Sequence, residues 1–353
     1  MQRFQRSLVL GALGTLSLLG VQSCASIQGV DFLPCATGDS VKSGVAPCDI
    51  YGAAKTPCVA AFSTARRLYA GYAGPLYEVT RASDTATLNV GLLSDGYADA
   101  ASQDTFCAGT TCTITRIFDQ SPRHNDLSVA PAGTASRGSG PGGEDLPAAA
   151  DSLAVNAGGH KVYGIFLSAG MGYRNDATKG IAINGESEGV YMVGSGTHVN
   201  SGCCFDFGNA ETDSHNHGQG HMDALRLLCD SFCNPEVGLD MEDGTYPPFP
   251  VPSGMTFVTA MGVNDGQRSY AVYWGNAQDG CLVTSDSRPL PAAGYMPMHQ
   301  EGAIILGIGG DNSNWSEGSF FEGAMTAGAP SNATLSAVQA NVVSAGYAAV
   351  PQP

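Results

Sequence analysis

Two acidic residues stand two positions apart in an otherwise apolar run, Leu239-Asp-Met-Glu242. If this run is a β-strand, Asp240 and Glu242 point to the same face, because successive side chains of a strand alternate between faces. Carboxylates that share a face repel each other, so the pKa of at least one should move, as is common where acid/base chemistry takes place. The alternative is a surface strand on which both carboxylates are solvated.

A third acidic candidate follows a hydrophobic stretch within residues 301–314. This stretch runs into Gly309, Gly310, Asp311 and Asn312. Glycine lets the backbone approach a ligand closely, and a loop at the end of a strand can aim Asp311 at that ligand. Spacing alone favours a solvated turn, in which Asp and Asn bind backbone amides. A calcium loop is a further alternative, but no Glu closes a twelve-residue EF-hand pattern.

Three histidines lie close together at His215, His217 and His221. Their spacing could provide zinc ligands, two close together and a third four residues later. The surrounding Ser, Asn and Gly residues indicate a loop, which favours solvent-exposed histidines over a metal site. We therefore expect neither a metal ion nor a cofactor.

The N-terminus has the pattern of an export signal. Arg3 and Arg6 precede an uncharged apolar stretch, and small residues follow it, which predicts a signal peptide over residues 1–23. Cleavage beside Cys24 could leave a lipid anchor on that cysteine. We expect a secreted protein, or alternatively a lipoprotein at the cell surface. Loss of both arginines lowers the net charge from −16 to about −18, which disfavours nucleic acid as a partner and suits a neutral substrate.

The chain has 11 cysteines, and an exported chain meets oxidising conditions that favour disulfides. Short spacings suggest three pairs, and elimination suggests a fourth: Cys48 with Cys58, Cys107 with Cys112, Cys229 with Cys233, and Cys35 with Cys281. Cys203 and Cys204 are adjacent. They form a vicinal disulfide that makes a flat apolar patch suited to a sugar face, or else each is free or bonded elsewhere.

Composition favours an all-β fold, since only 14% of residues are charged while 47 are Gly. The clearest predicted strands cover 189–193, 255–263, 269–274, 302–308 and 319–326, with a long loop at 131–148. Short helices are predicted at 63–72 and 333–347. We expect a linker at 24–45 and one catalytic domain at 46–348, built as a two-sheet antiparallel β-sandwich of the jelly-roll or concanavalin-like type.

Several segments, collinear from about Ala46 to Tyr347, resemble glycoside hydrolase family 54, the AbfB-type α-L-arabinofuranosidases. They are Cys48-Asp-Ile-Tyr, Thr56-Pro-Cys58-Val-Ala-Ala, Gln103-Asp-Thr-Phe-Cys107 with Cys112, Cys203-Cys204-Phe-Asp-Phe-Gly-Asn-Ala-Glu211, Gly220-His-Met222, Asp240-Met-Glu242, and the segment from Glu301 through Gly-Gly-Asp-Asn-Ser to Asn314.

The resemblance implies a retaining exo-glycosidase that releases terminal arabinofuranose from arabinan, arabinoxylan or arabino-oligosaccharides. Glu242 would be the nucleophile and Asp311 the acid/base, about 5–5.5 Å apart as retention requires. The residues that would bind or line the sugar are Asp240, Asp243, Gly310, Asn312 and the vicinal pair Cys203 and Cys204. It also supports the pairs Cys48 with Cys58 and Cys107 with Cys112. We expect a monomer.

Three features depart from the family. Asp243 replaces an expected asparagine, and the pocket tryptophan has no counterpart, with Phe232 as a partial substitute at best. Cys229 and Cys233 provide an additional disulfide. No arabinose-binding module is expected after the catalytic domain. The alternative functions are a sugar-binding sandwich without activity and an exo-glycosidase of the β-xylosidase type.

Overall fold

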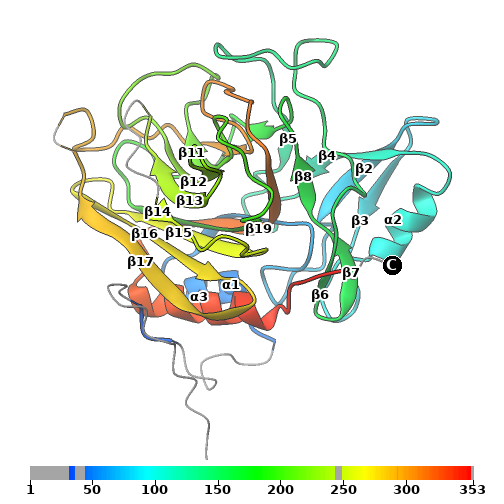
Figure 1. Ribbon diagram of the computed structural model, residues 1–353, viewed down its shortest axis with the longest axis horizontal. Coiled ribbons are helices and arrows are strands. Elements are labelled where there is room, and N and C mark those ends of the chain that lie inside the picture. The colour runs from blue at the N-terminus through cyan, green and yellow to red at the C-terminus, as the bar shows by residue number, and fades with distance from the viewer. Residues whose placement is uncertain (1–31, 36–43, 243–248, 292, 351–353) are drawn as a thin grey trace, which may run out of the picture.

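The computed structural model describes residues 32–35, 44–242, 249–291 and 293–350. Strands predominate, arranged in two large sheets and one small sheet (Figure 1). The described helices are α1 (Pro47–Ala53), α2 (Ala100–Phe106) and α3 (Asn332–Ser344). None of the described helices is long and apolar enough to cross a membrane. The predicted signal peptide, Cys24 and Asp243 lie outside the described residues.

The first sheet has seven strands in the order β1-β19-β10-β15-β16-β17, with β8 also paired to β19. All of these pairs are antiparallel. The bounds are β1 (Cys58–Ser63), β8 (Ile165–Leu167), β10 (Glu188–Gly194), β15 (Val258–Asn264), β16 (Ser269–Asn276), β17 (Asp279–Pro289) and β19 (Gly318–Ala327).

The second sheet has ten strands in the order β14-β13-β12-β11-β18-β9-β5-β4-β2-β3. Its bounds are β2 (Tyr77–Arg81), β3 (Thr87–Val90), β4 (Cys112–Ile117), β5 (Leu127–Val129), β9 (Tyr173–Asn175), β11 (Asp206–Ala210), β12 (Asp223–Cys229), β13 (Pro235–Asp240), β14 (Phe249–Pro250) and β18 (Ala303–Leu306). A small third sheet joins β6 (Ala154–Ala157), β7 (His160–Tyr163) and β20 (Ala348–Ala349).

The two large sheets face each other across one hydrophobic core. Phe207 of the ten-stranded sheet meets Phe62 edge-on at 6.1 Å between ring centroids and Phe320 at 5.2 Å, both from the seven-stranded sheet. Helices α1 and α3 lie on the far side of the seven-stranded sheet (Figure 1). That sheet is therefore covered on both faces, which explains why its strands are apolar without clean alternation. The predicted two-sheet antiparallel β-sandwich is confirmed.

The five predicted strands are all present, as β10, β15, β16, β18 and β19, and residues 131–148 form no strand. The closing helix is confirmed as α3, where the Ser331 hydroxyl caps the N-terminus by accepting the N–H of Thr334 at 3.3 Å. Helices α1 and α2 were not predicted.

The helix predicted at 63–72 is wrong. Ser63 ends β1, and its Oγ accepts the N–H groups of Ala65 and Arg66, each at 3.0 Å, in a local turn. Arg66 then reaches Glu322 of β19. Ser63 was correctly recognised as a residue that binds backbone amides, but long-range pairing of Arg66 decides the outcome against a helix.

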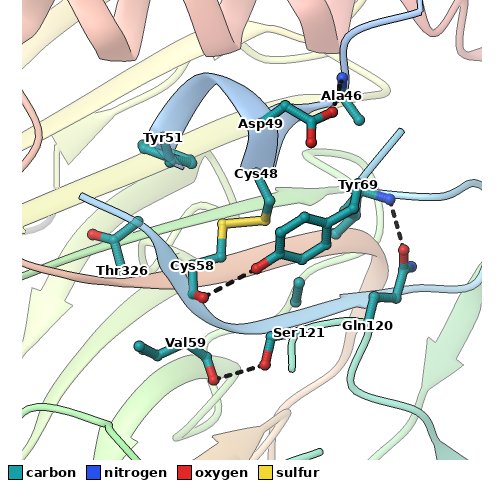
Figure 2. The surroundings of a disulfide bond; sticks show 12 residues. Ala46, Cys48, Asp49, Tyr51, Cys58, Val59, Tyr69, Gln120, Ser121 and Thr326 are labelled. Carbon is teal, nitrogen blue, oxygen red and sulfur yellow. Dashed lines mark hydrogen bonds between the residues drawn. A yellow bond between two sulfur atoms is a disulfide. The ribbon is translucent and has the colours of Figure 1, made fainter. Parts of the chain in front are cut away.

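All disulfides suggested by spacing or resemblance form, and so does the pair suggested by elimination. They are Cys35–Cys281, Cys48–Cys58, Cys107–Cys112, Cys203–Cys204 and Cys229–Cys233. Figure 2 shows Cys48–Cys58, which joins α1 to β1 beside Tyr69, whose hydroxyl donates to the Cys58 carbonyl at 3.0 Å. Cys35–Cys281 attaches the segment before α1 to β17, where the Leu33 N–H also donates to the Leu282 carbonyl at 2.9 Å.

Candidate active site

Strand register places Asp240 on the outer face of the ten-stranded sheet. Across β13, β12, β11 and β18 the aligned residues are Asp240, Ala224, Gly208 and Ile305. Their neighbours along each strand, Leu239, Leu225, Phe207 and Leu306, belong to the core between the sheets. Within this row Asp240 is the one ionisable residue, and Ala224 and Gly208 beside it have a small side chain or none.

Asp240 is 6% exposed, and its Oδ2 lies 3.5 Å from Nη1 of Arg226 on the neighbouring strand. Burial raises the pKa of Asp240, the charge of Arg226 opposes that rise, and the charge of Asp311 adds to it. The pKa of Asp240 is thus shifted, but its main cause is burial and not the repulsion by Glu242 that the spacing predicted. The contribution of Asp311 also indicates that the two segments meet in space.

Glu242 is positioned by a turn and not by strand alternation. Strand β13 ends at Asp240, and Glu242 adopts φ of 63°. Its N–H donates to Asp240 Oδ1 at 3.1 Å, and the Tyr295 hydroxyl donates to its carbonyl at 2.7 Å. Asn216 Nδ2 donates to its Oε1. The assumption that one strand carries both carboxylates is wrong, but the two residues do lie together.

The vicinal disulfide lies against Asp240. One sulfur from each of Cys203 and Cys204 and a carboxylate oxygen of Asp240 are all within 4.8 Å of one another. The Cys204 N–H donates to the Ser313 carbonyl at 3.1 Å, and the Trp315 N–H donates to the Cys203 carbonyl at 2.9 Å. These bonds join the disulfide to the loop that follows β18.

Asp311 lies in that loop, half-buried, with Oδ1 accepting the Ser313 N–H at 3.0 Å and the Ser313 hydroxyl at 2.6 Å. A Cβ on Gly309 would lie 3.2 Å from Cys204 Sγ and 3.6 Å from Asp311 Oδ1. The absence of a side chain at Gly309 thus allows Asp311 and the disulfide to approach each other, whereas the sequence predicted that the glycines admit a ligand.

A buried arginine that was not predicted holds this loop. Arg174 of β9 is 2% exposed and donates through Nη1 to the Gly310 carbonyl at 2.5 Å. It also bonds the carbonyl of Glu211 and the carboxylate of Asp176. Because its guanidinium forms a rigid fork, Arg174 sets the position of Gly310 next to Asp311.

Asn312 lies beneath the loop and not on its surface. It is fully buried, and its Nδ2 donates to Asp145 Oδ1 at 3.2 Å and to the Ser136 carbonyl at 3.4 Å. With no exposed surface, the Asn312 side chain cannot contact a ligand unless the loop moves. Asn312 therefore supports the loop that carries Asp311, in place of the predicted contact with substrate.

Two further carboxylates lie near the site, Asp206 at the start of β11 and Glu211 directly after its end. Asp206 is fully buried with neither carboxylate oxygen hydrogen-bonded, and burial, followed by the charge of Asp240, raises its pKa well above the usual value. Glu211 is also fully buried, and burial raises its pKa. A Cβ on Gly310 would lie 2.0 Å from Glu211 Oε2. A charged residue between Phe205 and Phe207 in a strand was the signal that could have identified Asp206.

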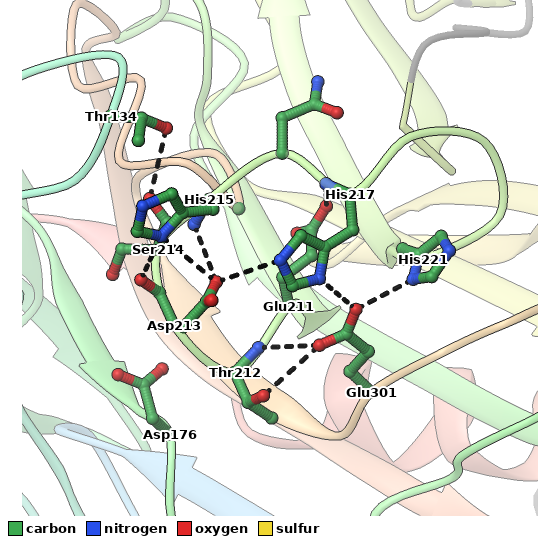
Figure 3. Close-up of polar contacts among 12 residues, drawn as sticks. Thr134, Asp176, Glu211, Thr212, Asp213, Ser214, His215, His217, His221 and Glu301 are labelled. Atoms are coloured by element: carbon green, nitrogen blue, oxygen red, sulfur yellow. Dashed lines mark hydrogen bonds and ion pairs between the residues drawn. The ribbon is translucent and has the colours of Figure 1, made fainter.

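The histidines divide into two groups. His217 and His221 both contact Glu301, whereas His215 bonds the main-chain carbonyl of Asp213 at 2.8 Å (Figure 3). Phe232, the suggested substitute for a pocket aromatic residue, is 87% exposed and lies in the loop that Cys229–Cys233 closes.

A family model described as "Alpha-L-arabinofuranosidase B, catalytic" matches residues 47–348. The chain is 48% identical to an α-L-arabinofuranosidase of Hypocrea jecorina over 338 residues, which cover 90% of this chain and 65% of the relative. It is also 48% identical to an "Arabinofuranosidase/B-xylosidase" of Trichoderma koningii, with the same coverage of 90% and 65%. The chain thus spans about 65% of the length of these curated relatives.

Solved structures agree. A glycoside hydrolase family 54 α-L-arabinofuranosidase soaked with a cyclic sulfate inhibitor superposes with a TM-score of 0.84 at 44% identity, covering 87% of this chain and 66% of the other. An arabinofuranosidase complexed with arabinofuranosyl-α-1,2-xylobiose gives a TM-score of 0.82 at 45% identity, with coverage of 87% and 66%.

Proposed function

The chain belongs to the family of α-L-arabinofuranosidase B catalytic domains, and on that premise we propose that it is a retaining, exo-acting α-L-arabinofuranosidase. The observation that carries the proposal is the convergence of Glu242 and Asp311 on Asp240. Glu242 donates its N–H to Asp240 at 3.1 Å, and the charge of Asp311 contributes to the raised pKa of Asp240. Two carboxyl groups in one site are what glycoside hydrolysis needs.

In the proposed mechanism the Glu242 carboxylate attacks the anomeric carbon of a terminal arabinofuranose. Asp311 gives its proton to the glycosidic oxygen, so the leaving group departs as an alcohol. Asp311, now ionised, takes a proton from water, whose oxygen attacks the same carbon and expels Glu242. Two inversions restore the original configuration.

The contacts of each carboxyl group suit its proposed role. Asp240 and Tyr295 hold the main chain of Glu242, and Asn216 donates to its Oε1, which supports a carboxylate over a protonated acid at this position. Both hydrogen bonds from Ser313 go to Asp311 Oδ1. We therefore assign the transferred proton to Asp311 Oδ2.

We propose arabinofuranosyl groups on xylan as the leading substrate class, with arabinan and arabino-oligosaccharides as further members. The support is the bound arabinofuranosyl-α-1,2-xylobiose in a relative of the same fold. Activity on β-xylosides is a second candidate, favoured by the name of the Trichoderma koningii relative. We expect the β-xyloside activity to be the weaker of the two, because a pocket shaped for a furanose fits a pyranose less well.

The test compares the wild-type chain with Glu242→Gln and Asp311→Asn on two substrates, 4-nitrophenyl α-L-arabinofuranoside and an arabinoxylo-oligosaccharide. Glu242→Gln should lose at least about 10³-fold in kcat on both, because no other group can form the covalent intermediate. Asp311→Asn should lose about 10²–10⁴-fold on the oligosaccharide and less on the nitrophenyl substrate, whose leaving group needs no proton.

Asp84→Asn, on the turn between β2 and β3, is the control for a carboxylate outside the site and should keep wild-type kinetics. The anomeric configuration of the first product, followed by NMR, distinguishes retention from inversion. An inverted product or an active Glu242→Gln would exclude the mechanism. A wild-type chain that binds arabinose without turnover would instead indicate a sugar-binding protein.

We also propose that the protein is exported, with residues 1–23 removed. Five disulfides among the described residues support an oxidising compartment. Mass spectrometry of the mature chain tests this and reports whether Cys24 carries lipid. A mature N-terminus at Met1 would contradict export by this signal.

A further inference from the structure

A cluster of two histidines and one carboxylate lies at the edge of the loop between β11 and β12 (Figure 3). His217 Nδ1 is 2.5 Å from Glu301 Oε1, and His221 Nδ1 is 2.8 Å from the same oxygen. One ligand atom from each of these three residues lies within 4.8 Å of the other two. Two imidazoles and a carboxylate are a common ligand set of protein-bound zinc.

The partner groups around the cluster are those that orient metal ligands in known sites. Glu301 Oε2 accepts the Thr212 N–H at 3.3 Å and the Thr212 hydroxyl at 3.2 Å, so Oε1 is left to face the histidines. His217 Nε2 lies 3.4 Å from Asp213 Oδ1. A carboxylate at the second nitrogen of a histidine fixes the tautomer in which the first nitrogen is free to bind a metal.

The exposure of the three side chains and the distances between their ligand atoms also suit a metal ion. The side chains of His217, His221 and Glu301 are 36%, 28% and 19% exposed, so an ion can enter from solvent. Tetrahedral zinc with bonds of about 2.0–2.1 Å separates its ligand atoms by about 3.4 Å. The observed 2.5 and 2.8 Å separations would therefore widen by less than about 1 Å.

We propose that His217, His221 and Glu301 bind one divalent transition-metal ion, with Zn²⁺ as the best match, and that this ion attaches the loop before β12 to the start of β18. The ion lies between the two Nδ1 atoms and Glu301 Oε1, and any proton held there is released to solvent. Water completes the coordination. His215, which a search by histidine spacing would have included, is not a ligand, because it bonds within its own turn at Asp213.

A single residue, Asn216, connects the proposed metal site to the candidate nucleophile Glu242. Asn216 precedes His217 and donates to Glu242 Oε1, and the His217 N–H donates to Glu211 Oε1 at 3.3 Å. Bound metal therefore restrains the residue that orients Glu242. This consequence for activity rests on the proposed function, whereas metal binding itself does not.

The test uses the full chain without a polyhistidine tag, treated with chelator and then titrated with Zn²⁺ and Co²⁺. We expect one equivalent to bind by calorimetry, a visible absorption band with Co²⁺, and a Tm increase of about 4 °C at 100 times Kd. His221→Ala and Glu301→Gln should each weaken binding at least tenfold. His215→Ala, on the same loop, should bind like wild type.

Absence of binding below about 1 mM by the wild-type chain would overturn the proposal, as would equal losses in His215→Ala and His221→Ala. Near-ultraviolet circular dichroism reports whether each variant is folded, and the Co²⁺ spectrum of wild type tests the site without any substitution. If metal binds but arabinofuranosidase activity is absent, the site stands and the proposed function fails. If activity is present and metal does not bind, the proposed function stands and the metal site fails.

Discussion

Two buried carboxylates, one in each large sheet, lie beside an arginine but differ in how their oxygens are bonded. Glu322 of β19 is fully buried and accepts from Arg66 Nε at 2.6 Å and Nη2 at 2.7 Å. The Tyr347 hydroxyl donates to it at 2.6 Å and the Tyr191 hydroxyl at 3.3 Å. Each Glu322 oxygen therefore has two donors.

Asp206 of β11 is also fully buried, directly across from Arg226 of β12. Neither Asp206 oxygen is hydrogen-bonded, and Arg226 Nε has no acceptor, since the guanidinium instead lies 3.5 Å from Asp240. Buried polar groups in proteins are nearly always bonded, and the exceptions gather where a ligand or a reaction uses them. The difference separates a carboxylate that holds the fold together from one that lies beneath the candidate active site.

The largest effect on stability is expected at Glu322 and Arg66, where both carboxylate oxygens are hydrogen-bonded. Arg66→Met leaves the Glu322 charge buried without its cation, so the free energy of unfolding should fall by about 3–5 kcal/mol. Urea denaturation measures it, with Arg67→Met as the matched control on the neighbouring, partly exposed arginine. A loss below about 1 kcal/mol would mean that the two tyrosines alone can hold Glu322.

A smaller effect, mainly on activity, is expected from Arg174→Lys. Lysine cannot bond Gly310, Glu211 and Asp176 together, so the loop carrying Asp311 should shift and kcat/KM fall by about 10²-fold. If Arg174 acts through Asp311, the loss should be larger for poor leaving groups. Arg116→Lys, an exposed residue on β4, is the control. Equal losses with every leaving group would indicate a general fold defect.

Changing each carboxylate to its amide should alter the stability of the chain in opposite directions at Glu322 and at Asp206. Glu322→Gln should destabilise the chain by about 1–3 kcal/mol, because charge-assisted bonds to Arg66 are lost. Asp206→Asn should stabilise it at neutral pH, because burial raises the pKa of Asp206 and a neutral amide avoids the cost of ionising there. Thermal and urea unfolding of both variants at pH 7 provide the measurement. Destabilisation by both would contradict the contrast between the two carboxylates.

The smallest expected effect is on the pH dependence of the free energy of unfolding, which tests the same contrast. Since burial raises the pKa of Asp206, the folded chain binds its proton more tightly than the unfolded chain. The stability that this group contributes therefore falls as pH rises above about 4, the unfolded pKa. Asp206→Asn should remove this fall in stability with pH. The free energies of unfolding of wild type and variant should therefore match near pH 4 and differ by pH 7. Parallel profiles would exclude a raised pKa at Asp206.

Much of the fold followed from local pattern. Runs such as 269–274 and 319–326 are apolar, β-branched or aromatic and bounded by turn residues, and both became strands. Ser331 preceded an apolar helical pattern and caps α3. The helix predicted at 63–72 failed because good helix formers carry no information about Glu322, a partner 256 positions from Arg66.

The candidate site likewise has residues that the sequence identified and contacts that it could not predict. Asp240, Glu242 and Asp311 were recognisable by residue type, and the resemblance assigned their roles. Other contacts could not be predicted, because each is made between segments that are distant in sequence. These are Arg174 with Gly310, Asn216 and Tyr295 with Glu242, and Glu301 with His217 and His221.

Residue types and spacing were therefore enough to establish a disulfide-bonded β-sandwich and three acidic candidates, because strands, turns and short disulfide loops depend on neighbours in the chain. Only the tertiary structure decided which carboxylates are bonded and which are not. Strand register sets Asp206 opposite Arg226, whereas Glu322 is bonded by Arg66 and Tyr347, which come from segments outside the strands. Two similar acidic residues thus acquire opposite roles through their surroundings.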